Sequence, residues 1–308
     1  MSPRPVDIPP RVRQRAEGLG GQGEEWLSRL PAIVDALARR WSLDVGESLE
    51  GGTAAFVARV RTAAGSEAIL KVGSPVADFA SQAATIAAAA GRGYVRLFDY
   101  AAESNAMLLE PLGASMVQSG LPPGRQLEVL VELLRTAWEA PADGLAFENK
   151  ALSLGILIES LWEQLGHPID GAVVEQALDF VERRSGAVGS FQSVRLHGDA
   201  VPANALRVLA PRAGAETGFV LVDPDGFFGD PAYDLGVALR DWCDELRQAP
   251  ERARAFCRIL ADRSGLDAQA IWEWGYIERV STGLYLLSMK MDDLAEPFLA
   301  TAHLLRRA

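Results

Sequence analysis

The sequence is poor in the residues that build metal centres and disulfide frameworks. Its 308 residues include two cysteines, Cys243 and Cys257, and three histidines, His167, His197 and His303. None of them shows the spacing of zinc ligands, so no zinc cluster is expected. We interpret the cysteines as reduced thiols inside a cytoplasmic protein, with a disulfide between them as the alternative.

Long apolar runs and a surplus of positive charge are also missing. No stretch approaches the roughly 18 apolar residues of a membrane helix, and the N-terminus has no continuous apolar segment of a secretory signal. Lys and Arg number 30 against 41 Asp and Glu, which gives a net charge of −11. This balance disfavours nucleic acids and anionic membranes and favours a cationic partner.

The strongest functional pattern starts at His197. Asp199 lies five residues before Asn204, and the apolar run 218–222 then leads to Asp223. The order H-x-D-x-x-x-x-N, apolar strand, Asp matches the catalytic loop and metal-binding Asp of protein kinases. Phosphoryl transfer needs a carboxylate for the hydroxyl proton, and an amide and a carboxylate for Mg²⁺. The pattern therefore predicts Asp199 as general base and Asn204 and Asp223 as Mg²⁺ ligands.

Three neighbouring residues are predicted to support this site. His197 is expected to orient the catalytic loop. Asp230 is expected to cap a helix that begins at Pro231, and Asp234 to accept hydrogen bonds from the loop.

The first third of the chain reads as a small sheet. Alternating residues predict two strands within Ser48–Arg61 and a third over Glu67–Val72, which carries Lys71 in an apolar setting. A buried lysine needs an anionic partner, so Lys71 is predicted to contact nucleotide phosphates, with a solvated strand-end lysine as the alternative. The turn before it is either a nucleotide cover or an ordinary hairpin turn. Its small residues are Gly51, Gly52 and Thr53.

The segments after Lys71 complete the predicted nucleotide site. Kinases place a Glu in the helix after the lysine to pair with it, but the predicted helix over 76–90 contains none, and its nearest acid is Asp78. The resemblance to kinases implies that the acidic position lies at or near Asp78, with a different partner for Lys71 as the alternative. Strands over 94–99 and 106–110 follow. Glu110 to Leu112 then forms a connector that would offer backbone groups to an adenine edge.

Helical spacing dominates from residue 126 onward, apart from the catalytic stretch. Helices are predicted over 125–139, 156–165, 173–184, 235–246, 252–262, 267–277 and 280–291. Strands early and helices late predict an α+β chain with two lobes. Residues 1–20 are expected to be a loose tail, 21–112 a nucleotide-binding lobe and 113–308 a helical lobe.

Several sequence segments add a resemblance to a known family. HGDAVPANAL and LVDPDGFFGDPAYDL resemble the aminoglycoside phosphotransferases, within them the branch of streptomycin 6-phosphotransferases that is also associated with hydroxyurea phosphorylation. Further similar segments, such as AILKVGSP and WGYIERVSTGLYLL, extend the resemblance over roughly residues 20–290. It implies a protein-kinase-like fold with a small antiparallel sheet and a mainly helical lobe, and the use of ATP and Mg²⁺, with GTP as an alternative nucleotide.

The predicted substrate is a small, cationic, hydroxylated molecule, an aminoglycoside-like antibiotic such as streptomycin. Carboxylates and tryptophan faces would hold its charged groups. The candidate residues are Asp225, Asp241, Trp242, Glu245, Trp274 and Glu278. The alternatives are a turn role for Asp225, and solvated helix faces or core tryptophans for the others.

Two other functions stay open. One is a kinase of another small hydroxylated metabolite or natural product. The other is a nucleotide-binding module with little transfer activity, which the missing helix Glu motivates. A monomer and a homodimer are both compatible with the sequence.

Overall fold

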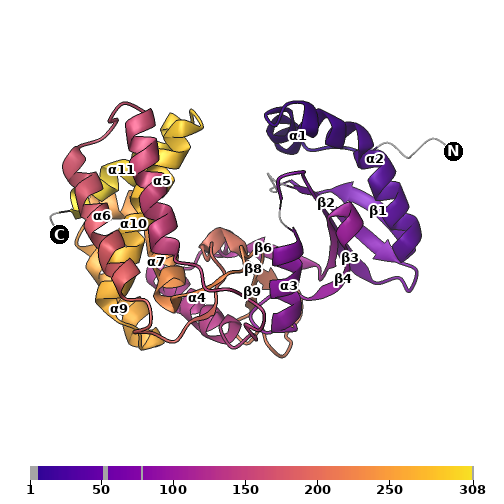
Figure 1. Cartoon of the computed structure of the whole chain (residues 1–308). Coiled ribbons are helices and arrows are strands. Elements are labelled where there is room, and N and C mark those ends of the chain that lie inside the picture. Colours follow the sequence, from indigo (N-terminus) through magenta and orange to yellow (C-terminus); the bar gives the residue numbers. More distant parts are fainter. Residues whose placement is uncertain (1–5, 51–54, 78, 307–308) are drawn as a thin grey trace.

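A computed structural model describes residues 6–50, 55–77 and 79–306. Figure 1 shows a lobe with a sheet, in indigo and purple, beside a larger lobe of helices that runs from magenta to yellow. The predicted nucleotide-binding residues Gly51, Gly52, Thr53 and Asp78 lie outside the described residues.

The sheet lobe has five antiparallel strands in the order β1-β2-β3-β5-β4. Their bounds are Leu43–Ser48 for β1, Ala55–Thr62 for β2, Glu67–Gly73 for β3, Leu97–Ala101 for β4 and Ala106–Leu109 for β5. Side chains alternate between faces, so Phe56, Leu70 and Val72 pack in the core beneath the N-terminal helices. Lys71 points to the other face, opposite Val57 and Met107 in the register.

Three helices belong to this lobe: α1 (Pro10–Glu17), α2 (Gly21–Trp41) and α3 (Phe79–Ala89). The expectation of a loose tail over 1–20 is wrong for α1, because Val12 and Ala16 are buried against the sheet-lobe core. Pro31 lies inside the single helix α2.

Short strands join the two lobes. A three-stranded sheet has the order β6-β8-β9, from Leu112–Ser115, Ala205–Val208 and Phe219–Leu221. Two-residue strands, β7 (Val194–Arg195) and β10 (Phe228–Gly229), pair beside it. Three 3₁₀ turns complete the lobes and their junction: η1 (Ala102–Ser104), η2 (Met116–Ser119) and η3 (Pro202–Asn204). The catalytic stretch therefore runs through the lobe junction.

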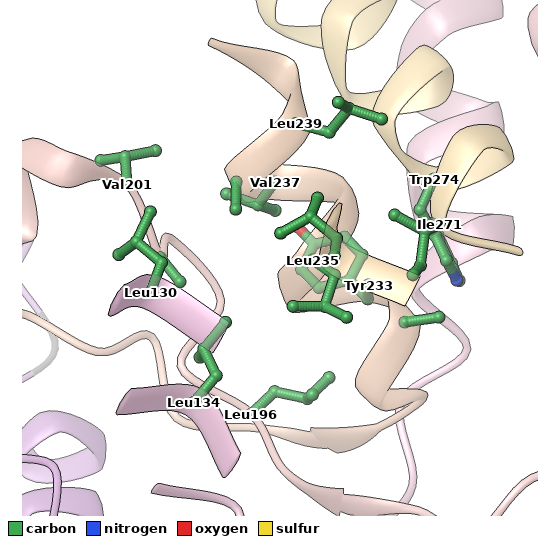
Figure 2. Close-up of a cluster of buried hydrophobic side chains, with 14 of the residues drawn as sticks. Leu130, Leu134, Leu196, Val201, Tyr233, Leu235, Val237, Leu239, Ile271 and Trp274 are labelled. Carbon is green, nitrogen blue, oxygen red and sulfur yellow. The ribbon is translucent and has the colours of Figure 1, made fainter. Parts of the chain in front are cut away.

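The helical lobe is built around α10. Its helices are α4 (Pro123–Ala137), α5 (Lys150–Gln164), α6 (Gly171–Gly186), α7 (Pro231–Arg240), α8 (Cys243–Gln248), α9 (Arg252–Ser264), α10 (Ala268–Ser288) and α11 (Asp292–Leu305). Figure 2 shows Tyr233 and Leu235 of α7 between Ile271 and Trp274 of α10 on one side and Leu134 of α4 on the other. This packing anchors the helix that follows the catalytic stretch.

Several elements differ from the sequence-based prediction. Strand β1 lies over Leu43–Ser48, where a strand within 48–61 was expected, and α5 begins six residues before the predicted start. The segment 235–246 is divided into α7 and α8, because Trp242 adopts a left-handed backbone conformation with φ 73°. The segments 267–277 and 280–291 form one helix, α10, which ends at Ser288. Among the described residues, no helix combines the length and the apolar character needed to cross a membrane.

Candidate active site

The catalytic loop follows β7 and is fixed by a buried carboxylate. Asp234, in the first turn of α7, accepts hydrogen bonds from the backbone N–H groups of His197 at 3.0 Å and Gly198 at 2.8 Å. The indole N–H of Trp138 donates to the same carboxylate at 2.9 Å. The predicted role of Asp234 in holding the loop is confirmed.

His197 orients the loop from within, as predicted. Its Nδ1 accepts the backbone N–H of Asp199 at 3.1 Å, and its Nε2 lies 2.9 Å from the carbonyl oxygen of Val222. Because Nδ1 accepts, Nε2 is the ring nitrogen that can donate to the carbonyl. It stacks on Tyr94, with ring centroids 5.8 Å apart. The histidine thus connects the loop of Asp199 to the strand that leads to Asp223.

Asp230 also has the predicted role. Its carboxylate caps α7 by accepting the N–H of Ala232 at 2.9 Å. Its second oxygen accepts the indole N–H of Trp274 at 2.8 Å. The cap therefore ties α7 to α10 as well.

Asp199 is held on both oxygens. One accepts a hydrogen bond from Arg240 Nη2 at 2.9 Å, and the other from Asn204 Nδ2 at 2.9 Å. Burial opposes the ionised form, but the charge and hydrogen bond of Arg240, with help from His197 and Asn204, outweigh it and lower the pKa of Asp199. The carboxylate is therefore charged and oriented before a substrate arrives.

Arg240 is a residue of the candidate site that the sequence-based prediction did not include. Its guanidinium bridges Asp199 to the buried Glu278, 3.1 Å away, and Tyr233 donates to Glu278 at 2.6 Å. Burial lowers the pKa of Arg240, but its carboxylate neighbours, Glu278 first, then Asp241 and Asp199, raise it more strongly, so the group stays protonated. The sequence feature that could have indicated it is a basic residue at the C-terminal end of the helix that Asp230 caps.

Asp223 and Asn204 lie at neighbouring strand ends. Ala205 pairs with Leu221, and the N–H of Val222 donates to the carbonyl oxygen of Asn204 at 2.9 Å. Asp223 has a left-handed backbone conformation with φ 58°, which Asp tolerates better than most residues. Such conformations are concentrated at functional sites. Both predicted metal ligands thus lie at the same end of the paired strands β8 and β9.

These two residues fit a magnesium ion. The amide nitrogen of Asn204 donates to Asp199, so its oxygen is the atom left to coordinate a cation. The Asp223 side chain is 47% exposed, although it forms an ion pair with Lys71. Within the described residues, no group of three His, Cys, Asp or Glu side chains could hold a metal by itself. The remaining ligands would therefore be phosphate and water oxygens, the usual arrangement for Mg²⁺.

Lys71 has the anionic partner that its burial demands. The ammonium group pairs with Asp223 and lies 4.9 Å above the ring of Phe79 at the start of α3. This ion pair joins the sheet lobe to the catalytic stretch. The expected partner position, Asp78, lies outside the described residues. Asp223 supplies a carboxylate to Lys71, and the described part of α3, Phe79–Ala89, contains none.

Helix α3 is also attached to the loop after Asp223. Ser81 Oγ donates to the carbonyl oxygen of Asp225 at 2.9 Å, and it lies 3.2 Å from the carbonyl oxygen of Gly226. Gly226 has φ 74° and lies so close to Ser81 and Thr85 that a side chain there would clash. The loop after Asp223 and α3 are therefore packed as one unit.

The predicted connector lies between the five-stranded sheet and β6. The carboxylate of Glu110 holds Arg212 through two contacts of 2.7 Å and accepts the backbone N–H of Arg96 at 3.1 Å. Leu112 begins β6 opposite Val208. The side chain of Glu110 thus has a structural role, and backbone contact of this segment with a nucleotide stays a prediction.

The predicted substrate residues divide into two groups. Trp274 is 3% exposed and Glu278 is 5% exposed. Both are committed to internal contacts, with Asp230 and with Arg240, so the prediction that they contact substrate directly is wrong. Their helical spacing places them on the face of α10 that packs against α7, which a sequence cannot distinguish from a face lining a cleft.

The other candidates remain predictions. Asp225 is exposed beside Asp199, and burial together with the charge of Asp199 raises the pKa of Asp225. Asp241 contacts Arg240 at 3.6 Å, and Glu245 is half-buried in α8. The Trp242 indole donates to the carbonyl oxygen of Ala238 at 3.0 Å and is partly accessible. Of these residues, Asp225 and Asp241 both lie close enough to the predicted base for its charge to act on their pKa.

Comparison with known proteins decides the family. Residues 40–288 match the model of the aminoglycoside/hydroxyurea antibiotic resistance kinases. The chain belongs to this family. A streptomycin 6-kinase of Streptomyces glaucescens is 27% identical over 285 residues, which cover 91% of each protein. A hydroxyurea phosphotransferase of Kitasatospora aureofaciens is 29% identical over 240 residues, 76% of this chain and 68% of that one.

The fold comparison agrees with the family assignment. The aminoglycoside phosphotransferase APH(4)-Ia, solved with ADP and hygromycin B, superposes with a TM-score of 0.63 at 14% identity. The match covers 88% of this chain and 97% of that one. The family match and the streptomycin 6-kinase relative show that this protein is a phosphotransferase with an alcohol group as acceptor. The fold match shows that its fold is protein-kinase-like, as the sequence predicted.

Proposed function

We propose that this family kinase transfers the γ-phosphoryl group of ATP to a hydroxyl of a streptomycin-like aminoglycoside. The observation that carries the proposal is the Asp199 carboxylate, charged and fixed between Arg240 and Asn204, beside the Lys71–Asp223 pair. The named activity of the streptomycin 6-kinase relative supports the substrate class.

In the proposed reaction, the acceptor oxygen attacks the γ-phosphorus while the bond to the β–γ bridging oxygen breaks and ADP leaves. Asp199 takes the hydroxyl proton. Because Arg240 lowers the pKa of Asp199, the carboxylate is a weak base. It would therefore orient the hydroxyl first and accept the proton late, when the forming P–O bond has made the hydroxyl acidic, which suits a loose transition state.

The other side chains position the nucleotide. Lys71 would exchange its contact with Asp223 for nucleotide phosphates. Asn204 and Asp223 would hold Mg²⁺, which, when bound, neutralises developing charge on the phosphates. Asp225, exposed beside Asp199, would attract an ammonium or guanidinium group of the acceptor and so bring the neighbouring hydroxyl to the base.

The test is the variant Asp199→Asn, which keeps the shape of the side chain and its contact with Arg240. Streptomycin-dependent ADP release should fall about 10²–10⁴-fold, while Mg·ATP binding by calorimetry stays within a few-fold of the wild type. The control Asp262→Asn changes an exposed carboxylate on α9 and should leave both unchanged.

Streptomycin-dependent ADP release that survives Asp199→Asn would rule out this base. If the wild type releases ADP with hydroxyurea but with no aminoglycoside, hydroxyurea would replace the aminoglycosides as the proposed substrate. The relative named hydroxyurea phosphotransferase favours this as the second candidate. If the protein binds nucleotide but releases no ADP with any hydroxylated cation, its function would be that of a nucleotide-binding module without transfer activity.

A further inference from the structure

A second polar cavity lies in the helical lobe, outside the candidate active site. It has a volume of about 230 Å³ and lies where α6, α9, α10 and the end of α11 meet. Figure 1 shows these helices together at the side of the molecule opposite the sheet lobe. The polar residues that line it are Gln176, Arg183, Arg254, Gln269, Tyr276 and Arg306.

Two buried donors at this cavity have no acceptor among the residues that the structure describes. Tyr276 is 3% exposed, and within the described residues its hydroxyl has no hydrogen-bond partner. The Nε–H of Arg306 is also buried without a partner there. Burial raises the pKa of Tyr276, so the hydroxyl keeps its proton and acts as a donor. Unpaired buried donors are rare in folded proteins, and two at one cavity point to a missing acceptor.

The charges around the cavity are positive. Arg254 lies over the ring of Trp272, 3.7 Å from its centroid, and Arg183 lies over Phe180 at 5.4 Å. These contacts hold two guanidinium groups at the rim. Of the lining residues that the structure describes, none is Asp or Glu. In a protein with a net charge of −11, the guanidinium groups of Arg306 and of Arg183, which Glu273 compensates in part, favour an anion at this small cavity.

Among the described residues, the carboxylates nearest to the cavity either pair with arginines or act only weakly on Tyr276. Glu273 contacts Arg183 at 3.3 Å and Arg184 at 2.6 Å, so it offsets part of the charge at one side. Asp170 acts on Tyr276 only as the weakest of its electrostatic neighbours. Neither carboxylate supplies the acceptor that the Tyr276 hydroxyl and Arg306 Nε lack.

We propose that this cavity binds a phosphate-class oxyanion, with the Tyr276 hydroxyl and Arg306 Nε donating to its oxygens. Guanidinium groups match phosphate oxygens in geometry as well as in charge. The volume accommodates a phosphate or diphosphate group rather than a whole nucleotide. The oxyanion is either free inorganic phosphate or the phosphate group of a larger molecule that extends out of the cavity.

The test measures inorganic phosphate binding by calorimetry and thermal shift in a phosphate-free buffer. Tyr276→Phe removes the donor but keeps the ring, which packs edge-on against Phe180 with centroids 5.5 Å apart. Phosphate should bind this variant about tenfold more weakly. Without phosphate, its Tm should equal or exceed that of the wild type, because an unpaired buried hydroxyl is lost. Tyr285→Phe, an exposed tyrosine on the same helix, is the control and should bind phosphate like the wild type.

Arg306→Gln provides a second variant with the same expected loss. Phosphate binding that is equal in the wild type and in Tyr276→Phe would overturn the proposal. So would a lower Tm of Tyr276→Phe in the absence of phosphate, because the hydroxyl would then already have a partner. A parallel titration with ADP separates the two sources: Tyr276-dependent ADP binding identifies the phosphate group of a larger molecule, and its absence identifies the free ion.

Discussion

At the scale of single residues, Arg240 sets the protonation of the predicted base. It contacts Asp199 at 2.9 Å and Glu278 at 3.1 Å, and it is the main influence that lowers the pKa of Asp199 against burial. A base with a depressed pKa stays ionised as the pH falls, until the pH approaches that lowered value. The acid limb of the activity profile should therefore lie at low pH in the wild type.

Replacing Arg240 should move this limb. Arg240→Gln alone would leave Glu278 as an unpaired buried charge, which costs about 3–5 kcal/mol, so the change is combined with Glu278→Gln. In the double variant burial acts on Asp199 with little opposition, its pKa rises, and the acid limb of kcat/KM shifts to higher pH. The measurement is a pH profile of kcat/KM.

The matched control is Arg247→Gln with Glu296→Gln, which removes an exposed ion pair on α8 and α11. Its pH profile should match that of the wild type. An acid limb that is unchanged in the double variant at Arg240 and Glu278 would show that another group controls the pKa of Asp199.

The sequence could locate the acids of the site but not their neighbours. Asp199, Asn204 and Asp223 are close together because a short loop and two paired strands separate them, and spacing records such local geometry. Arg240 reaches Asp199 only because α7 packs on α10 in one orientation. For the same reason Trp274 and Glu278 look like a substrate cluster in the sequence and are internal in the fold.

At the scale of the elements, the contact between α7 and α10 positions Arg240. Gly236 lies against α10, where an added Cβ would clash with the Cβ of Trp274 and come within 2.8 Å of the backbone nitrogen of Gly275. The two glycines allow the helix backbones to approach closely. The orientation of α7, and with it the position of Arg240, depends on this small residue.

Gly236→Ala should therefore separate the helices. The expected loss in the free energy of unfolding is about 1–3 kcal/mol, as for other overpacked cores, measured by urea denaturation. Gly186→Ala is the control, because it lies at the end of α6 with nothing within 4 Å of an added Cβ. It should be neutral or stabilising by about 0.5–1 kcal/mol. Equal effects of the two variants would contradict the close-packing argument.

Most elements were predictable, and the exceptions have local causes. Periodicity identified β3 and helices with one buried face, such as α4 and α6, but it divided α10 into two segments and gave no helix over α11. Periodicity did not predict α1, which has few apolar residues among prolines and charged residues. These few residues are enough to hold the helix in place, because α2 covers them. Periodicity also joined α7 to α8, because the left-handed conformation of Trp242 leaves no mark in the apolar pattern.

At the scale of the whole molecule, the Lys71–Asp223 pair spans the two lobes. A nucleotide would compete with Asp223 for Lys71, while a cation would compete with Lys71 for Asp223. Binding of Mg·ATP should thus replace one ion pair with several contacts to both lobes and stabilise the protein by mass action.

Lys71→Met tests this exchange. Methionine keeps the apolar stem over Phe79 but removes the charge, so the fold should persist while most of the Tm increase with saturating Mg·ATP is lost. Lys290→Met, after the end of α10, is the control and should keep the full increase. A nucleotide-induced shift that is the same in both variants would mean that Lys71 does not contact the phosphates.

The two-lobed arrangement itself followed from the order of strands and helices along the chain. The relation between the lobes did not, because it depends on single contacts between distant residues, such as Lys71 with Asp223 and Glu110 with Arg212. These pairs lie 152 and 102 positions apart, and nothing in local spacing identifies them.

The attachment of α3 to the loop at Asp225 and Gly226 has a consequence for inhibition. Ser81 donates to carbonyl oxygens of this loop, and Thr85 packs against Gly226. A compound that inserted between the helix and the loop would pull the carboxylate of Asp223 out of place without occupying the ATP position. Such a compound would reduce turnover in a way that added ATP does not reverse, whereas an adenine mimic would be displaced.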